Sequence, residues 1–302
     1  MGEGFRLADV DPSSTPGFDG DKQQGRLELE AGVPALSELQ ERLFAASTQG
    51  APDAVLLVLQ AMDTAGKGGI VKHVVGSVDP QGVHHYAFKK PTEEERGHDF
   101  LWRVESHVLG LVNPMGVRYA AFKKPTAAER RHEYLWRIRK QLPAAGQIGV
   151  FDRSHYEDVL IGRVRGLAEP DEIERRYGAI NDFEAGLVES GTRIVKVMLQ
   201  ISADEQKARL AERLSRPDKY WKYNPGDVDE RELWPAYQEA YQVVFDRTST
   251  DAAPWFVVPA DRKWYARIAV QRLLLDALEG IDPQWPAADY DIAVEQARLA
   301  AT

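Results

Sequence analysis

Apolar and polar residues alternate along the chain in blocks that predict strands followed by helices. The run Ala54–Leu59 is unbroken and apolar, which is typical of a central strand in a parallel sheet. Just before it, Leu36, Leu39 and Leu43 recur at helical spacing and predict a first helix that starts after Pro34. The beginning of the folded region therefore reads as a helix followed by a central strand.

Strands and helices continue to alternate towards the C-terminus. Further strands are predicted at Ile148–Asp152, Thr192–Ile201 and Trp255–Pro259. Helices are predicted at residues 70–75, 172–189, 203–214, 229–245 and 263–278. This alternation predicts an α/β fold with a parallel sheet, which would occupy residues 33–302 as one domain. Residues 1–32 are rich in Gly, Asp, Ser, Pro and Gln without periodicity, so we expect a mobile N-terminal tail.

A tandem repeat interrupts this pattern. Residues 75–104 and 109–138 align without gaps at an offset of 34, with 17 identical pairs in 30 positions. Each copy reads as a turn, a short strand and a helix that opens with a capping box, Thr92 with Glu95 and Thr126 with Glu129. Two copies are too few for a solenoid, so residues 75–108 and 109–142 are interpreted as a duplicated strand–helix unit inside a globular fold.

Composition narrows the class of protein. The chain has no cysteine, which excludes disulfides, thiolate zinc sites and a cysteine nucleophile. It lacks both an apolar run of about 20 residues and a secretory signal, so we expect a cytoplasmic protein without a membrane partner. Although the net charge is −9, residues 60–165 hold 17 Lys or Arg against 12 Asp or Glu. This distribution favours a confined site for a polyanion over a nucleic-acid coat.

A glycine-bearing turn, residues 60–69, follows the first strand and precedes a helix. Its Gly66-Lys67 pair matches the end of a phosphate-binding loop, in which backbone N–H groups wrap an anion and a lysine binds outer phosphates. Ala61 replaces the first glycine of the usual pattern, and Gly68 replaces the hydroxyl residue that normally holds magnesium. The position between strand and helix still predicts a phosphate site.

Two carboxylates could replace the missing magnesium ligand. Asp63 lies inside the loop, and Asp152 ends the second predicted strand, where a metal-binding acid is typical. Each has a structural alternative, because Asp63 could form a turn and Asp152 could cap the next helix. Their joint presence around Lys67 favours a magnesium site.

A basic, aromatic segment at residues 213–235 joins two predicted helices. It carries Arg213, Arg216, Lys219, Lys222 and Arg231. Such segments often form lids that bring cations to a transferring phosphoryl group, although a solvated helix–helix connection is the alternative. The seven histidines suggest no metal site.

These motifs together resemble the polyphosphate kinase 2 family. The segments that carry the resemblance are residues 63–69, 88–92, 101–103, 152–160, 221–225, 253–261 and 263–264. The resemblance spans roughly residues 33–280. It implies a three-layer, thymidylate-kinase-like P-loop fold with a helical lid. It also implies magnesium-dependent transfer of the terminal phosphate of inorganic polyphosphate to AMP or ADP, or to GMP or GDP, by a dimer or tetramer. The stretch Ser154–Val159 is similar to the subgroup that accepts AMP as well as ADP.

The resemblance assigns roles to particular residues. Asp63 and Asp152 look like the acids that bind magnesium, or manganese in its place, and Lys67 looks like the phosphate-binding lysine. Arg153 resembles an arginine that meets the phosphates of donor or acceptor. Further phosphate- or nucleotide-binding candidates are Ala65, Gly66, Gly68, Gly69, Lys89, Lys123, Arg213, Lys219 and Lys222.

The repeat departs from the family pattern, which has one such unit. Lys89 and Lys123 therefore compete for one family position, and we hypothesise that one copy occupies the native place while the other adds at an open sheet edge. Two alternatives stay open. The chain could be a nucleoside-monophosphate kinase that uses ATP, or a catalytically impaired phosphate-binding protein in which the repeat has displaced the second acid.

Overall fold

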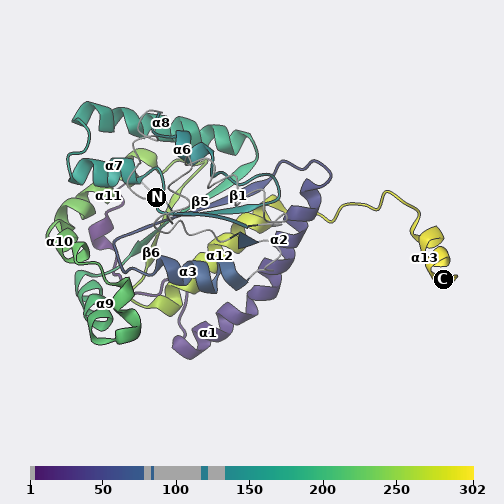
Figure 1. Cartoon of the computed structure of the whole chain (residues 1–302), viewed down its shortest axis with the longest axis horizontal. Helices are drawn as coiled ribbons and strands as arrows, with labels where there is room; N and C mark the ends of the chain where they lie inside the picture. Colours follow the sequence, from purple (N-terminus) through teal and green to yellow (C-terminus); the bar gives the residue numbers. More distant parts are fainter. Residues whose placement is uncertain (1–3, 78–82, 85–116, 122–132) are drawn as a thin grey trace, which may run out of the picture.

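A six-stranded sheet forms the centre of the molecule (Figure 1). The computed structural model describes residues 4–77, 83–84, 117–121 and 133–302. The strands are β1 (Ala54–Ala61), β2 (Val83–His84), β3 (Val117–Ala121), β4 (Ile148–Asp152), β5 (Thr192–Gln200) and β6 (Trp255–Pro259). They lie in the order β2-β3-β4-β1-β5-β6, and every pairing is parallel. This arrangement confirms the α/β fold with a parallel sheet that was predicted from the alternation of strands and helices.

The middle strands are buried because helices cover both faces of the sheet. Residues Ala54–Gln60 of β1 are buried, as the unbroken apolar run predicts. In the parallel register, Leu59 of β1 lies beside Asp152 of β4, and Ala121 of β3 lies beside the same aspartate. The carboxyl ends of β1, β3 and β4 therefore meet at one edge, where ligands bind in open α/β sheets.

The helices form two layers around the sheet. They are α1 (Lys22–Ala31), α2 (Val33–Ser47), α3 (Lys67–His73), α6 (Trp136–Arg139), α7 (Glu157–Val164), α8 (Pro170–Glu189), α9 (Ala203–Ser215), α10 (Gly226–Glu232), α11 (Trp234–Thr248), α12 (Lys263–Ile281) and α13 (Ile292–Ala300). In Figure 1, α7, α8 and α11 lie on one side of the sheet, and α3, α12, α1 and α2 on the other. No helix within the described residues is long and apolar enough to cross a membrane.

The predicted helix at residues 229–245 is corrected to two helices. Helix α10 ends at Glu232 and α11 begins at Trp234, so the chain bends at Leu233. Pro235 explains the break, because proline lacks the N–H needed inside a helix but fits the first turn of a new one. The segment predicted to be a lid, residues 213–235, contains the end of α9, a 3₁₀ segment at Pro217–Lys222, α10 and the first residues of α11.

The expected N-terminal tail is also corrected, since residues 4–32 hold elements that pack on the body. Leu7 is buried, and its backbone N–H donates to Gln242 of α11. Helix α1 opens with a capping box at Asp21 and packs on α12, with Gly25 close against the ring of Trp264. Glycine permits this approach because a Cβ at residue 25 would meet the Trp264 ring at 2.4 Å. The composition of residues 1–32 gave no sign of these contacts.

The two copies of the repeat contribute neighbouring strands. Val83 of β2 pairs with Val117 of β3, and these residues are 34 positions apart, the same offset as in the sequence repeat. Strand β3, from the second copy, lies beside β4, while β2 lies at the outer edge. The described residues therefore have the arrangement that an appended edge unit requires. The capping boxes at Thr92 and Thr126 lie outside the described residues.

Candidate active site

The loop after β1 has the backbone of an anion-binding turn. Thr64 and Gly66 have positive φ angles, 67° and 120°, and α3 starts directly at Lys67. Glycine is suited to residue 66 because side chains strain a backbone with φ near 120°. The Lys67 side chain folds back across the loop, so that Nζ donates to the carbonyl of Ala61 at 3.3 Å and lies 4.0 Å from Oδ1 of Asp152.

Asp63, Asp152 and Arg153 meet at the same place. Arg153 Nη2 donates to Oδ1 of Asp63 at 2.8 Å, so the residue after β4 is tied to the loop after β1. Burial lowers the pKa of Arg153, but the carboxylates of Glu157, Asp63 and Asp152 raise it by more, and the guanidinium stays charged. Sequence positions 90 residues apart thus converge on one cluster, as the two-carboxylate hypothesis requires.

The donor chemistry of this cluster fits a hard divalent cation. Both aspartates are partly exposed, at 30 % for Asp63 and 21 % for Asp152, and they present carboxylate oxygens beside a phosphate loop. Among the described residues, no group of three or more His, Cys, Asp or Glu side chains gathers as a complete metal site. Two protein carboxylates suit magnesium, because this ion usually completes its coordination with water and substrate phosphates.

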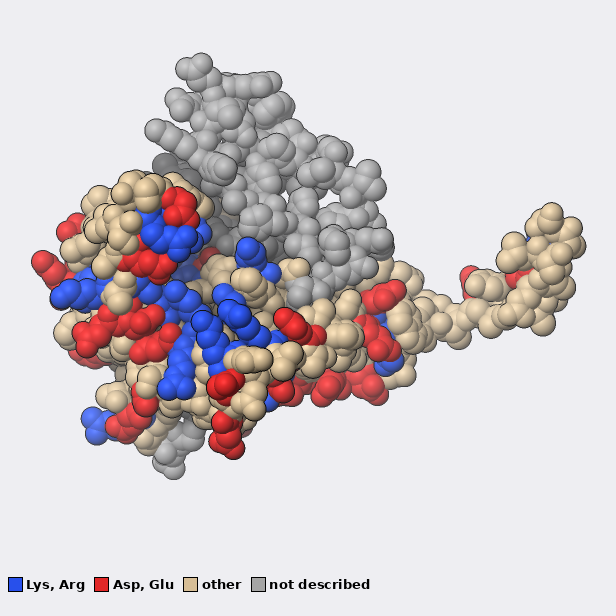
Figure 2. All heavy atoms as spheres, turned by 90° about the horizontal axis from the view of Figure 1, so that it is seen from below, with Lys and Arg blue, Asp and Glu red and all other residues tan. Residues whose placement is uncertain are grey.

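A cavity of about 540 Å³ opens beside the loop. Its lining includes the loop residues Thr64–Gly69 and Asp152, and its basic residues are Lys67, Lys72, Arg209, Arg213, Lys219, Lys222, Lys263 and Arg267. We call it the phosphate cavity. Figure 2 shows Lys and Arg side chains gathered in the left half of one face of the molecule. The concentration of cations predicts an anionic ligand.

The lid contributes three of its five predicted cations to the cavity. Lys219, Lys222 and Arg213 line it. Arg213 also braces the lid, because its Nη1 donates to the carbonyl of Lys222 at 2.9 Å and contacts Asp227 at 3.4 Å. The other two, Arg216 and Arg231, do not line the cavity.

The positions of Arg216 and Arg231 follow from their partners. Arg216 pairs on the exposed surface with Asp218 and Glu212. Arg231 donates to the carbonyl of Ala203 at 2.9 Å and to Oε1 of Gln206 at 2.7 Å, so it holds α10 against the start of α9. Arg231 therefore stabilises the lid, and the three lid cations that line the cavity are the three named as phosphate-binding candidates from the sequence.

Known proteins match this sequence over most of its length. A model of the family "Polyphosphate kinase 2 (PPK2)" matches residues 19–110 and 104–286. The chain belongs to the polyphosphate kinase 2 family. An AMP/ADP-polyphosphate phosphotransferase from Meiothermus ruber is 39 % identical over 282 residues, which are 93 % of this chain and 91 % of that protein. An ADP-polyphosphate phosphotransferase from Rhodopseudomonas palustris is 34 % identical, covering 91 % of this chain and 86 % of that protein.

Solved structures of this family confirm the P-loop kinase fold. The crystal structure of polyphosphate kinase 2 from Arthrobacter aurescens TC1 superposes on this chain with a TM-score of 0.87 and 54 % sequence identity. The superposition covers 100 % of this chain and 95 % of the Arthrobacter chain. The polyphosphate kinase 2 match falls into two overlapping parts whose junction, residues 104–110, lies where the two repeat copies meet. Lys89 and Lys123, the two candidates for one family position, lie outside the described residues.

Arg209 is a site residue that the sequence analysis missed. It is 5 % exposed, and its guanidinium donates to the carbonyls of Thr64 and Ala65 and to those of Ala260 and Asp261, at 2.7–3.0 Å. It therefore joins the phosphate loop to the chain after β6. In the sequence, Arg209 reads as an ordinary surface ion pair with Glu205, four residues earlier on the helix, and nothing marks it as buried.

Lys263 and Arg267, at the start of α12, were also missed. They line the cavity one helical turn apart, and no acid among the described residues lies within ion-pair distance of either. Burial and the charge of Arg209 lower the pKa of Lys263, and the more distant acids Glu212 and Glu205 oppose that fall only in part. Burial and the charge of Arg26 lower the pKa of Arg267. Since neither cation has an acid within ion-pair distance, an anionic ligand in this cavity would relieve the repulsion between them and their cationic neighbours. The Lys-x-x-x-Arg spacing at a helix start could have suggested them.

Glu157 is a third carboxylate of the site. Its Oε2 lies 3.4 Å from Nη1 of Arg153. Gln60, with its amide oriented to satisfy all neighbours, donates to Oε1 of Glu157 at 2.9 Å. Burial raises the pKa of Glu157, and the charges of Arg153 and Lys67 oppose that rise. Arg153 is thus held between Asp63 and Glu157.

Proposed function

We propose that this chain transfers the terminal phosphate of inorganic polyphosphate to AMP and ADP. The observation that carries the proposal is the meeting of Lys67, Asp63, Asp152 and Arg153 beside the phosphate cavity. The names of its relatives, which include AMP/ADP-polyphosphate and ADP-polyphosphate phosphotransferases, support the donor and the acceptors. The acceptor base, adenine or guanine, is part of the proposal to be tested.

Each side chain has a role in an in-line transfer. Asp63 and Asp152 would hold a magnesium ion, or manganese in its place, and that ion would neutralise charge on donor and acceptor phosphates when bound. Lys67 and the backbone N–H groups of Gly66, Lys67 and Gly68 bind phosphate oxygens. The other two predicted loop residues, Ala65 and Gly69, shape the turn, because their N–H groups donate to the carbonyls of Met62 and Gly66. Arg153 stabilises the negative charge that develops on the transferred group. Arg213, Lys219 and Lys222 bring further positive charge from the lid, whose closure excludes water.

Three observations bear on the alternatives. An impaired protein with a displaced second acid is disfavoured, because Asp152 lies 4.0 Å from Lys67 and in register with Leu59 of β1. An ATP-dependent nucleoside-monophosphate kinase is disfavoured by Ala61 and Gly68, where the usual ATP-binding loop has glycine and a hydroxyl residue. The density of cations around the cavity also favours a donor with many negative charges.

The decisive experiment is a phosphate-transfer assay with two donors and four acceptors. Purified protein receives polyphosphate or ATP as donor and AMP, ADP, GMP or GDP as acceptor, with magnesium, manganese or EDTA. We expect transfer from polyphosphate to AMP and ADP that EDTA abolishes. Transfer to AMP from ATP but not from polyphosphate would establish the nucleoside-monophosphate kinase instead. Polyphosphate binding without turnover would establish the impaired binding protein.

We also propose that the chain works in the cytoplasm as a homo-oligomer, a dimer or tetramer. The C-terminal segment supports self-association, because five of the exposed large apolar side chains lie within 15 residues there: Trp285, Tyr290, Ile292, Val294 and Leu299. Helix α13 stands clear of the body (Figure 1). Light scattering on the full chain and on a chain ending at residue 287 tests this: we expect the truncation to reduce the number of chains per particle, and an unchanged number would contradict a role for the segment.

A further inference from the structure

The three residues after Arg153 are unusually well fixed for a turn between a strand and a helix. Ser154, His155 and Tyr156 are all fully buried, at 0 % exposure. The Ser154 hydroxyl and backbone N–H donate to the Gln60 side-chain oxygen at 3.0 and 3.1 Å, and Ser154 Oγ accepts from the backbone N–H of Tyr156. Arg153 itself has a φ of 67°, a left-handed conformation that is strained for a residue with a side chain. Such a conformation persists only where the surroundings enforce it.

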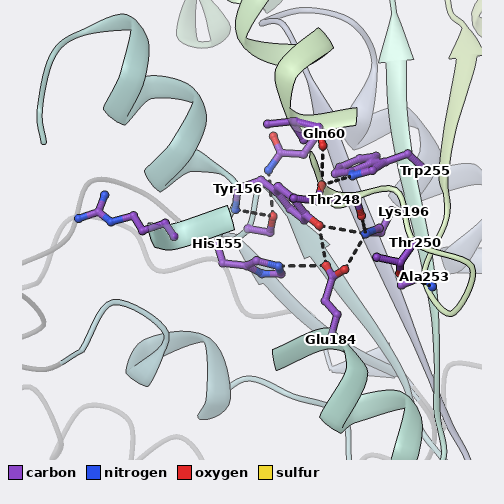
Figure 3. A network of polar contacts seen from close by, with 12 residues as sticks. Gln60, His155, Tyr156, Glu184, Lys196, Thr248, Thr250, Ala253 and Trp255 are labelled. Atoms are coloured by element: carbon purple, nitrogen blue, oxygen red, sulfur yellow. Dashed lines mark hydrogen bonds and ion pairs between the residues drawn. The ribbon is translucent and has the colours of Figure 1, made fainter. Parts of the chain in front are cut away.

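A buried polar network provides these surroundings (Figure 3). The carboxylate of Glu184, on α8, accepts from Tyr156 Oη at 2.7 Å and from Lys196 Nζ at 2.6 Å, and it bonds His155 Nε2 at 3.2 Å. Lys196, on β5, also donates to Tyr156 Oη at 3.0 Å and to the backbone carbonyl of Thr248, at the end of α11, at 2.7 Å. We call His155, Tyr156, Glu184 and Lys196 the buried network. It ties the segment after β4 to α8, β5 and α11.

The stability of the fold alone does not account for this arrangement. Replacing a buried ion pair by apolar residues of similar volume is often neutral or stabilising, so a Lys–Glu pair is weak evidence for stability. Lys196 and Glu184 are 0 % and 2 % exposed, and none of the four residues lines the phosphate cavity. Burial raises the pKa of Glu184, but the hydrogen bond from His155 and the charge of Lys196 lower it by more, so the carboxylate is held in its charged form. Two members of the network, His155 and Tyr156, lie directly after Arg153, so their contacts restrict the backbone of the turn at residue 153.

We infer that the four residues of the buried network are positioning residues for Arg153. They hold the turn after β4 in the conformation that directs the guanidinium between Asp63 and Glu157, although none of them touches a phosphate. This inference rests on the proposed role of Arg153 in phosphoryl transfer. It predicts that damage to the network lowers kcat through Arg153, because a small displacement of a charge-stabilising group costs rate more than ground-state binding.

A double-mutant cycle between His155 and Arg153 tests the inference. His155→Leu removes one donor to Glu184 without leaving a charge unpaired, since Lys196 stays in place. We expect kcat with polyphosphate and ADP to fall by up to about 100-fold while both KM values change little. His155→Gln, which keeps a donor near the position of Nε2, should recover most of the loss. In an Arg153→Ala background, His155→Leu should have no further effect, because the group that the network positions is already absent.

The possible outcomes separate the inference from the proposed function. If Arg153→Ala alone keeps full activity, the role of Arg153 in the proposed function is wrong. If Arg153→Ala is impaired and His155→Leu reduces kcat by the same factor in both backgrounds, the network acts independently of Arg153 and the inference is overturned. Wild-type kcat in His155→Leu overturns it as well.

Two further variants distinguish a specific loss of kcat from a general loss of folding. Tyr156→Phe removes only the hydroxyl group from the network, and it replaces His155→Leu in the cycle if that variant does not unfold cooperatively. Gln271→Leu is the matched control, because Gln271 is also buried and bonds a backbone carbonyl, that of Leu29, far from β4 in the sequence. It should lower the melting temperature without a change in kcat. Equal kcat losses in Gln271→Leu and Tyr156→Phe would count against the inference.

Discussion

The buried network and the phosphate cavity use the same kinds of charged side chain in opposite ways. In the network, Lys196 is fully buried and its ammonium group donates to Glu184, Tyr156 and Thr248. In the cavity, Lys263 and Arg267 have no acid of the described part of the chain within ion-pair distance. The charge of Lys196 is neutralised inside the protein, whereas the charges of Lys263 and Arg267 remain available to an anion. Arg213 combines the two situations, because it lines the cavity and also contacts Asp227.

The largest effect is expected from a substitution that removes one partner of the buried Lys196–Glu184 ion pair. Lys196→Met leaves the Glu184 carboxylate buried without a counter-ion, so we expect the free energy of unfolding to fall by about 3–5 kcal/mol. Urea denaturation of both proteins measures this. The double variant Lys196→Met with Glu184→Gln should regain much of the loss, because no uncompensated charge then remains. Equal stability of Lys196→Met and wild type would show that the pair is not coupled.

Next in size are substitutions at the transfer site. Lys67→Ala, Asp63→Asn and Asp152→Asn should each lower the transfer rate at least about 100-fold, corresponding to roughly 3 kcal/mol, with a small change in melting temperature. Arg216→Gln is the matched control, because Arg216 lies on the lid and pairs with Asp218 and Glu212 outside the cavity. An undiminished rate in any of the three variants contradicts the site assignment.

A smaller effect is expected from the cations at the cavity wall. Lys263→Gln and Arg267→Gln should each raise the KM for polyphosphate by about fivefold, or roughly 1 kcal/mol, because each interaction is partly screened by solvent. The melting temperature should stay constant or rise, since repulsion with Arg209 or Arg26 is reduced. The KM of both variants should also depend less on salt. A lower melting temperature without a change in KM would show that Lys263 and Arg267 stabilise the fold and do not bind polyphosphate.

The smallest effect is expected from removal of the first repeat copy. Of the strands that the structure describes, deleting residues 75–108 removes the edge strand β2 and keeps β3 beside β4. We therefore expect cooperative unfolding and transfer activity to persist. Deleting residues 109–142 instead tests whether the first copy can take the place of the second. If neither shortened chain folds, the hypothesis of an appended edge unit is wrong.

Sequence patterns alone predicted the parts of this protein that depend on local chemistry. The apolar run Ala54–Leu59, the glycine turn and the acid at the end of the strand Ile148–Asp152 are local signals, and parallel strands bring such chain segments to one edge of the sheet. The sequence could therefore predict that Lys67, Asp63 and Asp152 lie close together. The lid stays a prediction from the charges and aromatic residues of residues 213–235, and Pro235 divides the helix that was predicted at its end.

The tertiary structure decided which charges face the ligand and which support the fold. Arg209 and Arg216 both read as helical surface arginines, yet one clamps the phosphate loop and the other is exposed. Lys196 reads as the polar member of a strand, yet it is the centre of a buried network. Residues 4–32 read as a tail, yet they pack against α11 and α12. The physical reason is that a charge is assigned its role by the groups packed around it, and those groups come from segments distant in the sequence.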